Sequence, residues 1–308
     1  MSAASERAAR LATLPFESAS TSGVGHFTGF FRSIGELWVQ RELMGLLVRR
    51  ELKAKYKDSS LGFAWTLIRP LVMLLIYYFA IGKILGAERA IPSYAIFVFS
   101  GLTIWGLFAA IVSSGTSSII ANAGLIKKVY LPREIFPLAA TGSAIVDFLS
   151  QFAILVIATL ALRQPPLHFE LLGIFPALAV TVVYGTAIGI LLSALNVYLR
   201  DVQYLVEVGL NIFFWVSPIV YSFAFVHNAI LSTGHPILEQ IYLANPMSVA
   251  MLTFQRAMWI AGQDPSAHTL YPPNLDLRLL IMLVIGLVFL AIVQRIFSRL
   301  QGNFAQEI

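Results

Sequence analysis

The chain has 308 residues, of which 58% are hydrophobic and only 12% charged, and its mean hydropathy is +0.78. A soluble domain needs about a quarter of its residues charged to cover its surface, so the composition excludes that class and predicts an all-α integral membrane protein. The net charge of +5 does not favour nucleic acid, because nine of the 21 lysines and arginines precede Phe63 without an aromatic-rich basic module around them.

The first 62 residues divide into two predicted parts. Residues 1–35 are rich in Ser, Ala and Thr and lack the long apolar core of a cleavable signal, which predicts a disordered cytoplasmic tail. In residues 36–62, Leu43, Leu47 and Leu52 recur at intervals of four or five between lysines and arginines. This spacing predicts an amphipathic interface helix that lies along an anionic cytoplasmic leaflet and ends at Gly62.

Long apolar runs in the remaining part, residues 63–308, predict six transmembrane helices, since a bilayer core takes about 20 helical residues. The predicted spans are residues 64–85, 91–114, 136–162, 173–197, 202–223 and 277–296. Lysines and arginines accumulate on the side of the N-terminus and of the even-numbered loops. Both termini are therefore predicted to be cytoplasmic.

The loop at residues 122–135 is short, cationic and apolar at once. It places Lys127, Lys128 and Arg133 among Leu, Ile, Val and Tyr side chains, and Pro132 ends one short predicted helix before the next begins. Such a segment can dock into a groove on a cytoplasmic partner. The alternative, a loop held by lipid headgroups, remains open on spacing alone.

Residues 224–276 form the only long external region. Its semi-apolar run, residues 237–260, is interrupted by Pro246 and Arg256, so we expect short re-entrant helices rather than a seventh span. A solvent-exposed loop is the alternative, and the apolar content argues against it.

Four segments, taken in order, resemble the permease subunit of ABC exporters that move lipid-linked polysaccharides such as O-antigens, capsules, teichoic acids and galactan. They read LGFAWTLIRPL, NAGLIKKVYLPRE, LNVYLRDV with the later SPIVY, and NPMSVAMLTFQRAMW. The resemblance implies a homodimer in the bacterial cytoplasmic membrane, with a polyprenyl-linked substrate and two copies of a separate ATPase. Arg69 departs from it, because a neutral residue is expected there.

The sequence contains no GxxxxGK[ST] phosphate-binding loop, which agrees with ATP hydrolysis in a separate subunit. We therefore expect a permease that is not an enzyme and has no cofactor, with ATP and Mg²⁺ bound by the partner; the histidines lack metal-ligand spacing, so no metal site is expected. By resemblance, residues 122–135 are a coupling helix that acts together with the interface helix. The residues expected to couple ATPase closure are Leu125, Lys127, Lys128, Tyr130, Arg133, Glu134, Glu42, Arg49 and Arg50.

A path for a glycan needs flat apolar faces on which sugar rings can stack. Aromatic side chains are abundant in spans one, two and five, although lipid contact and packing are common alternatives for any one of them. The candidate path residues are Tyr77, Tyr78, Phe97, Trp105, Phe214, Trp215 and Tyr221.

Three charged residues fall inside predicted spans, where a charge costs roughly 2.5 to 3.5 kcal/mol. Arg69 and Glu207 lie at similar distances from the cytoplasmic ends of spans one and five, so they can pair as a brace, or alternatively contact the pyrophosphate of the carrier. Asp147 lies deeper and no partner is evident. Proton coupling is disfavoured because all five histidines lie outside the spans.

Two other functions compete with polysaccharide export. An ABC permease for drugs or lipids has the same architecture, whereas a membrane enzyme is disfavoured because the external acids are scattered over three loops. Fifteen arginines against six lysines suggest a GC-rich genome, which leans toward a galactan or an O-antigen.

Overall fold

The computed structural model describes residues 40–56, 64–128, 131–263 and 271–307. The predicted tail, residues 1–35, lies outside this part of the chain, as do both ends of the predicted interface helix. Within the described ranges the chain forms helices joined by turns and short extended pieces, and no strand. This agrees with the predicted all-α class.

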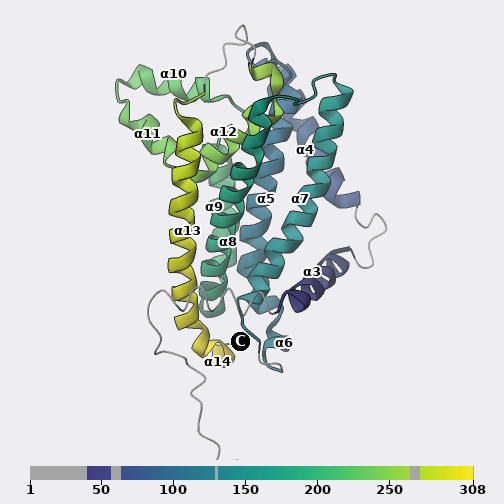
Figure 1. The fold of residues 1–308 in the computed structure, drawn as a ribbon, viewed down its shortest axis with the longest axis vertical. Helices are drawn as coiled ribbons and strands as arrows, with labels where there is room; N and C mark the ends of the chain where they lie inside the picture. Colours follow the sequence, from purple (N-terminus) through teal and green to yellow (C-terminus); the bar gives the residue numbers. More distant parts are fainter. Residues whose placement is uncertain (1–39, 57–63, 129–130, 264–270, 308) are drawn as a thin grey trace, which may run out of the picture. The chain divides into compact units, whose positions relative to one another are not determined.

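Four helices are long and apolar enough to cross a membrane. They are α5 (Tyr94–Ala121), α7 (Ile135–Ala161), α8 (Ile174–Tyr198), which follows the 3-10 turn Phe169–Gly173, and α13 (Leu275–Leu300). The helix α5 is mostly buried and packs against α7 and α8, while α13 packs against α8 (Figure 1). Spans two, three, four and six are therefore confirmed as helices of spanning length.

The predicted first and fifth spans are built differently. The first begins as α4 (Trp65–Tyr77), contains Pro70, and continues as a π-helix over Tyr78–Ile84. The fifth is α9 (Val202–Val216), which ends earlier than the predicted end at residue 223. The apolar helical stretches here, Pro70–Ile84 and Val202–Val216, are shorter than a full span, so their crossing of the bilayer stays a prediction.

Residues 217–222, between α9 and the next helix, are non-helical although most of them are buried. Their backbone carbonyls accept hydrogen bonds from side chains of other elements: Gln255 Nε2 donates to Pro218 at 2.9 Å, and the Tyr94 hydroxyl donates to Val220 at 2.8 Å. Because a buried carbonyl has no access to water, these donors replace the helical partners that the carbonyls have lost.

The predicted external region, as far as it is described, contains three short helices: α10 (Phe223–Thr233), α11 (Ile237–Leu243) and α12 (Pro246–Met258). The side chain of Asn245 caps α12 by accepting from Met247 N at 3.0 Å, and Pro246 occupies the first turn, where its missing N–H costs nothing.

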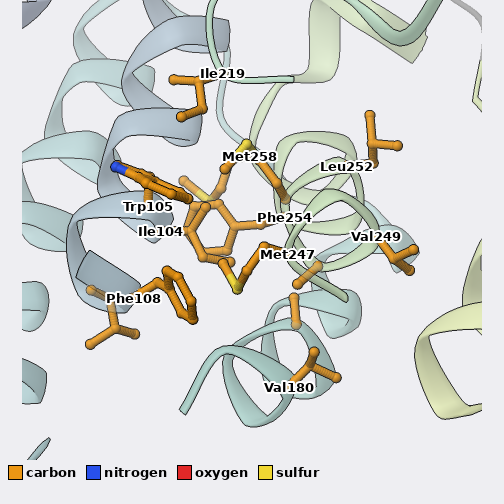
Figure 2. Packing of buried hydrophobic residues seen from close by; sticks show 14 of the residues in the cluster. Ile104, Trp105, Phe108, Val180, Ile219, Met247, Val249, Leu252, Phe254 and Met258 are labelled. Carbon is orange, nitrogen blue, oxygen red and sulfur yellow. The ribbon is translucent and has the colours of Figure 1, made fainter. Parts of the chain in front are cut away.

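The helix α12 is buried on nearly every face and packs against α5, α8 and α13. Figure 2 shows Phe254 of α12 directed toward Ile104 and Trp105 of α5. The interrupted apolar run predicted short re-entrant helices, and the run forms the two short helices α11 and α12; α12 is embedded among longer helices, whereas α10 and α11 are more exposed.

Three short elements lie at the other end of the molecule from α10 and α11: α3 (Arg41–Tyr56), α6 (Ala123–Ile126) and α14 (Phe304–Glu307), which follows the 3-10 turn Gln301–Asn303 (Figure 1). In the described part of the predicted coupling helix, residues 122–135, the helical residues are the single turn of α6 and Ile135, the first residue of α7. Pro132 lies in a non-helical stretch, which agrees with its missing N–H.

Candidate coupling surface and aromatic cluster

The helix α3 is fixed to the start of α7 by an apolar cluster. Leu47, which is 4% exposed, packs with Ile135, Phe136 and Ala139, and Leu125 of α6 lies against the same group. The opposite face of α3 carries exposed charged side chains, among them the predicted coupling residues Glu42 and Arg49. The amphipathic spacing thus buries the leucines against protein, not lipid alone.

Two polar contacts supplement this cluster. Arg50 Nη2 donates to Asn122 Oδ1, and Asn122 Nδ2 in turn donates to the Ser118 carbonyl at 2.7 Å. Arg50 is therefore engaged in fastening α3 to the residue that precedes α6. Burial raises the pKa of neighbouring Glu51, and the Arg50 charge opposes that shift.

Asp147, which had no evident partner in the sequence, forms an ion pair with Lys55 of α3. Lys55 Nζ lies 2.5 Å from Asp147 Oδ2, with the aspartate side chain 8% exposed and the lysine side chain 52% exposed. The signal in the sequence was the intramembrane charge, which requires a partner. The five cations of α3 were all candidates, and only the packing of α3 on α7 selects Lys55.

The predicted coupling residues of the 122–135 segment occupy different surroundings. Lys127 and Lys128 are exposed, Glu134 is buried, and the Arg133 guanidinium lies 5.5 Å from the centroid of the Phe304 ring. Tyr130 lies outside the described residues. The segment therefore presents two lysines outward while Arg133 and Glu134 face protein.

Aromatic side chains from the first, second and fifth predicted spans meet in one cluster. The rings of Tyr77 and Phe214 stack with centroids 5.8 Å apart, and Phe214 meets Trp105 edge-on at 5.9 Å. The ring of Trp215, the next residue of α9, meets Phe214 edge-on at 5.4 Å, and the residue is 54% exposed. Three of the predicted path residues are thus brought together, and a fourth lies on the adjoining surface.

The other predicted path residues make contacts within the chain. Phe97 is 2% exposed and packs edge-on against Trp259 at 4.9 Å. The Tyr221 hydroxyl donates to the carbonyls of Trp215 and Val216, which closes the end of α9. Tyr78 lies under the Lys83 ammonium, 5.3 Å from the ring centroid.

The predicted Arg69–Glu207 brace stays a prediction, because the Arg69 side chain lies outside what the structure describes. Glu207 is exposed on α9. The helices α4 and α9 meet at the Tyr77–Phe214 stack, eight residues after Arg69 (77 − 69) and seven after Glu207 (214 − 207). At about 1.5 Å per residue, these counts keep the two positions at similar depth.

The sequence did not predict the ion pairs that Arg256 forms. Arg256 of α12 pairs through Nε with Glu170, 2.9 Å away, and through Nη2 with Asp276 at the start of α13. The sequence showed Arg256 only as an interruption of an apolar run, and the two acids lie in separate loops. The arginine ties α12 to both neighbouring elements.

This geometry defines a class of protein: a multi-pass helical membrane protein in which an amphipathic helix packs beside a short cationic segment. Residues 42–259 match the family described as ABC-2 type transporter. The chain therefore belongs to that family, which confirms the resemblance predicted from the four sequence segments.

Individual relatives cover most of the chain. It is 28% identical over 278 residues to the O-antigen export system permease protein RfbA of Myxococcus xanthus, which covers 90% of this chain and 99% of that protein. RfbA of Klebsiella pneumoniae is 31% identical over 182 residues, 59% of this chain and 69% of that protein. The capsule polysaccharide export inner-membrane protein CtrC of Neisseria meningitidis is 22% identical over 273 residues, 86% and 95% of the two chains.

Proposed function

We propose that this chain is the membrane-spanning subunit of an ABC exporter that moves a lipid-linked polysaccharide across the bacterial cytoplasmic membrane. The observation that carries the proposal is the likeness over nine-tenths of the chain to a permease whose name states O-antigen export. A second relative of nearly full coverage is named for capsule polysaccharide export. An O-antigen or a galactan is the cargo that the arginine-rich composition favours.

In this proposal ATP is hydrolysed by two copies of a separate subunit, which dock at the end of the molecule that carries α3 and α6. That end is cytoplasmic, and α4, α5, α7, α8, α9 and α13 are the six crossing helices. The exposed Lys127 and Lys128 contact the ATPase, while α3, fixed to α7 through Leu47 and Lys55, passes its closure on to the spans.

The transport path lies between two copies of the chain, along α4 and α9. Both helices expose large apolar and aromatic side chains, which a single copy leaves uncovered. Trp215 provides a flat face for sugar rings, and the Tyr77–Phe214 stack supports α9 from behind. Stacking on aromatic faces tolerates many sugars, which suits a polymer that must slide.

Inside-out membrane vesicles from the host test the proposal, because they retain the native ATPase and glycan. We expect ATP to move lipid-linked glycan into the lumen, where periodate added outside no longer oxidises it, and we expect this protection to be lost in vesicles without the chain. ATP-dependent uptake of a fluorescent lipid or a drug, with no protection of glycan, would instead establish the alternative exporter class.

A further inference from the structure

The last residues of the described chain, Gln301–Asn303 and Phe304–Glu307, form a C-terminal hook that folds back against α8 and α13. Its anchor is Phe304, which is 0% exposed. The ring meets Tyr198 edge-on at 5.9 Å and Phe297 edge-on at 5.6 Å. The Tyr198 hydroxyl also donates to the Leu300 carbonyl at 2.8 Å, which satisfies one of the free carbonyls at the end of α13.

The hook also reaches the 122–135 segment. The Arg133 guanidinium lies 5.5 Å from the centroid of the Phe304 ring, within the range of a cation–π contact. Ile126 of α6 packs against the apolar cluster that contains Phe304 and, on another side, against the cluster that contains Leu47 of α3. The segment is therefore supported from two sides, by α3 and by the C-terminal hook.

We propose that Phe304 is a positioning residue for the 122–135 segment. The buried ring fixes Arg133 and, through the shared cluster, Ile126, so that the exposed Lys127 and Lys128 are presented in one orientation. Movement of the segment then acts on α8 and α13 through the hook as well as on α7 through α3. The step from positioning to ATPase coupling rests on the proposed function, whereas the positioning itself does not.

The absence of cysteine from the sequence allows the position of the segment to be measured with a single spin label. Gly124 of α6 is exposed, and a Cβ built there meets nothing within 4 Å, so labelled Gly124→Cys in the full-length protein in nanodiscs reports on the segment with little disturbance. We expect Phe304→Leu, which keeps an apolar side chain but removes the ring, to raise the mobility of the label. Glu307→Ala, an exposed change in the same hook, is the control and should leave the mobility unchanged.

A double-mutant cycle separates positioning from packing. If the ring acts through Arg133, label mobility in Phe304→Leu with Arg133→Gln should be no higher than in the more mobile single variant. Additive increases would overturn the proposal and reduce the ring to core packing, and so would unchanged mobility in both Phe304→Leu and Phe304→Ala.

The ATPase of the reconstituted complex, measured without the label, tests the second step. Phe304→Leu should lower the permease-stimulated rate several-fold while the KM for ATP stays unchanged, because the nucleotide site lies in the partner. Raised label mobility with an unchanged stimulated rate would support the positioning and overturn the coupling role given to the segment under the proposed function.

Discussion

At the scale of single residues, the ion pair between Lys55 and Asp147 connects α3 to α7. Removing the half-exposed lysine leaves the largely buried aspartate without this partner. We expect Lys55→Ala to lower the free energy of unfolding by about 1 to 2 kcal/mol, between the ranges typical of exposed and of buried pairs. Thermal unfolding of the purified protein in nanodiscs measures this change.

Lys53→Ala is the matched control, because Lys53 is an exposed cation of the same helix and its loss should cost less than about 0.5 kcal/mol. Lys55→Ala combined with Asp147→Asn should destabilise by less than the sum of the two single changes. Full additivity would show that the pair contributes nothing to stability.

Trp215 supplies a second test at this scale. Since Trp215 is 54% exposed and its ring has an edge-on contact with Phe214, Trp215→Ala should lower the free energy of unfolding by no more than about 1.5 kcal/mol, yet slow glycan export without lowering the basal ATPase rate. Phe175→Ala, at a 72% exposed aromatic of α8, is the control and should leave export unchanged. Equal effects of the two changes on export would remove Trp215 from the path.

At the scale of elements, the non-helical residues 217–222 depend on the close approach of α5. A Cβ built on Gly101 lies 3.0 Å from Gln255 Nε2 and 3.1 Å from the Ile219 carbonyl oxygen. Gly101→Ala should therefore destabilise the protein by about 1 to 3 kcal/mol, because backbone and a hydrogen-bonding side chain both have to shift. Denaturation of the purified variant tests this.

Gly209→Ala in α9 is the matched control. A Cβ there meets nothing within 4 Å, and alanine favours a helix over glycine by about 1 kcal/mol, so this change should be neutral or stabilising. Similar stability of the two alanine variants would mean that the 217–222 stretch does not require the contact with α5.

The exposed lysines of the 122–135 segment carry the coupling prediction. Lys127→Ala with Lys128→Ala should leave insertion and stability unchanged, because both side chains are exposed, and lower the permease-stimulated ATPase of the complex. Arg299→Ala serves as the control, because it removes an exposed cation from the last turn of α13. A stimulated rate equal to that of the control would end the coupling assignment.

The elements predictable from the sequence are those whose length and hydropathy are local properties. The four long helices follow directly from their apolar runs, and α12 follows from a run that Pro246 and Arg256 interrupt. The early end of α9 was not predictable, because the carbonyls beyond it are satisfied by Gln255, 37 residues from its acceptor, and by Tyr94, 126 residues from its own.

Some contacts of the candidate site were predictable before the structure, and others were not. The family resemblance implied that the 122–135 segment and α3 act together, and the structure brings them into contact through Leu47 and Arg50. The partners of Asp147 and Arg133 could not be predicted, because Lys55 and Phe304 become neighbours only after α3 and the C-terminal hook have packed.

At the scale of the whole molecule, the family, the amphipathic helix beside a cationic segment, and the exposed aromatic face of α9 all support an export permease. Depletion of the protein in its host tests whether its cargo is a polysaccharide. Polyprenyl-linked glycans are measured by mass spectrometry together with mature surface polysaccharide. We expect full-length lipid-linked polymer to accumulate inside the cell and surface polymer to be lost. Normal levels of both would contradict polysaccharide export.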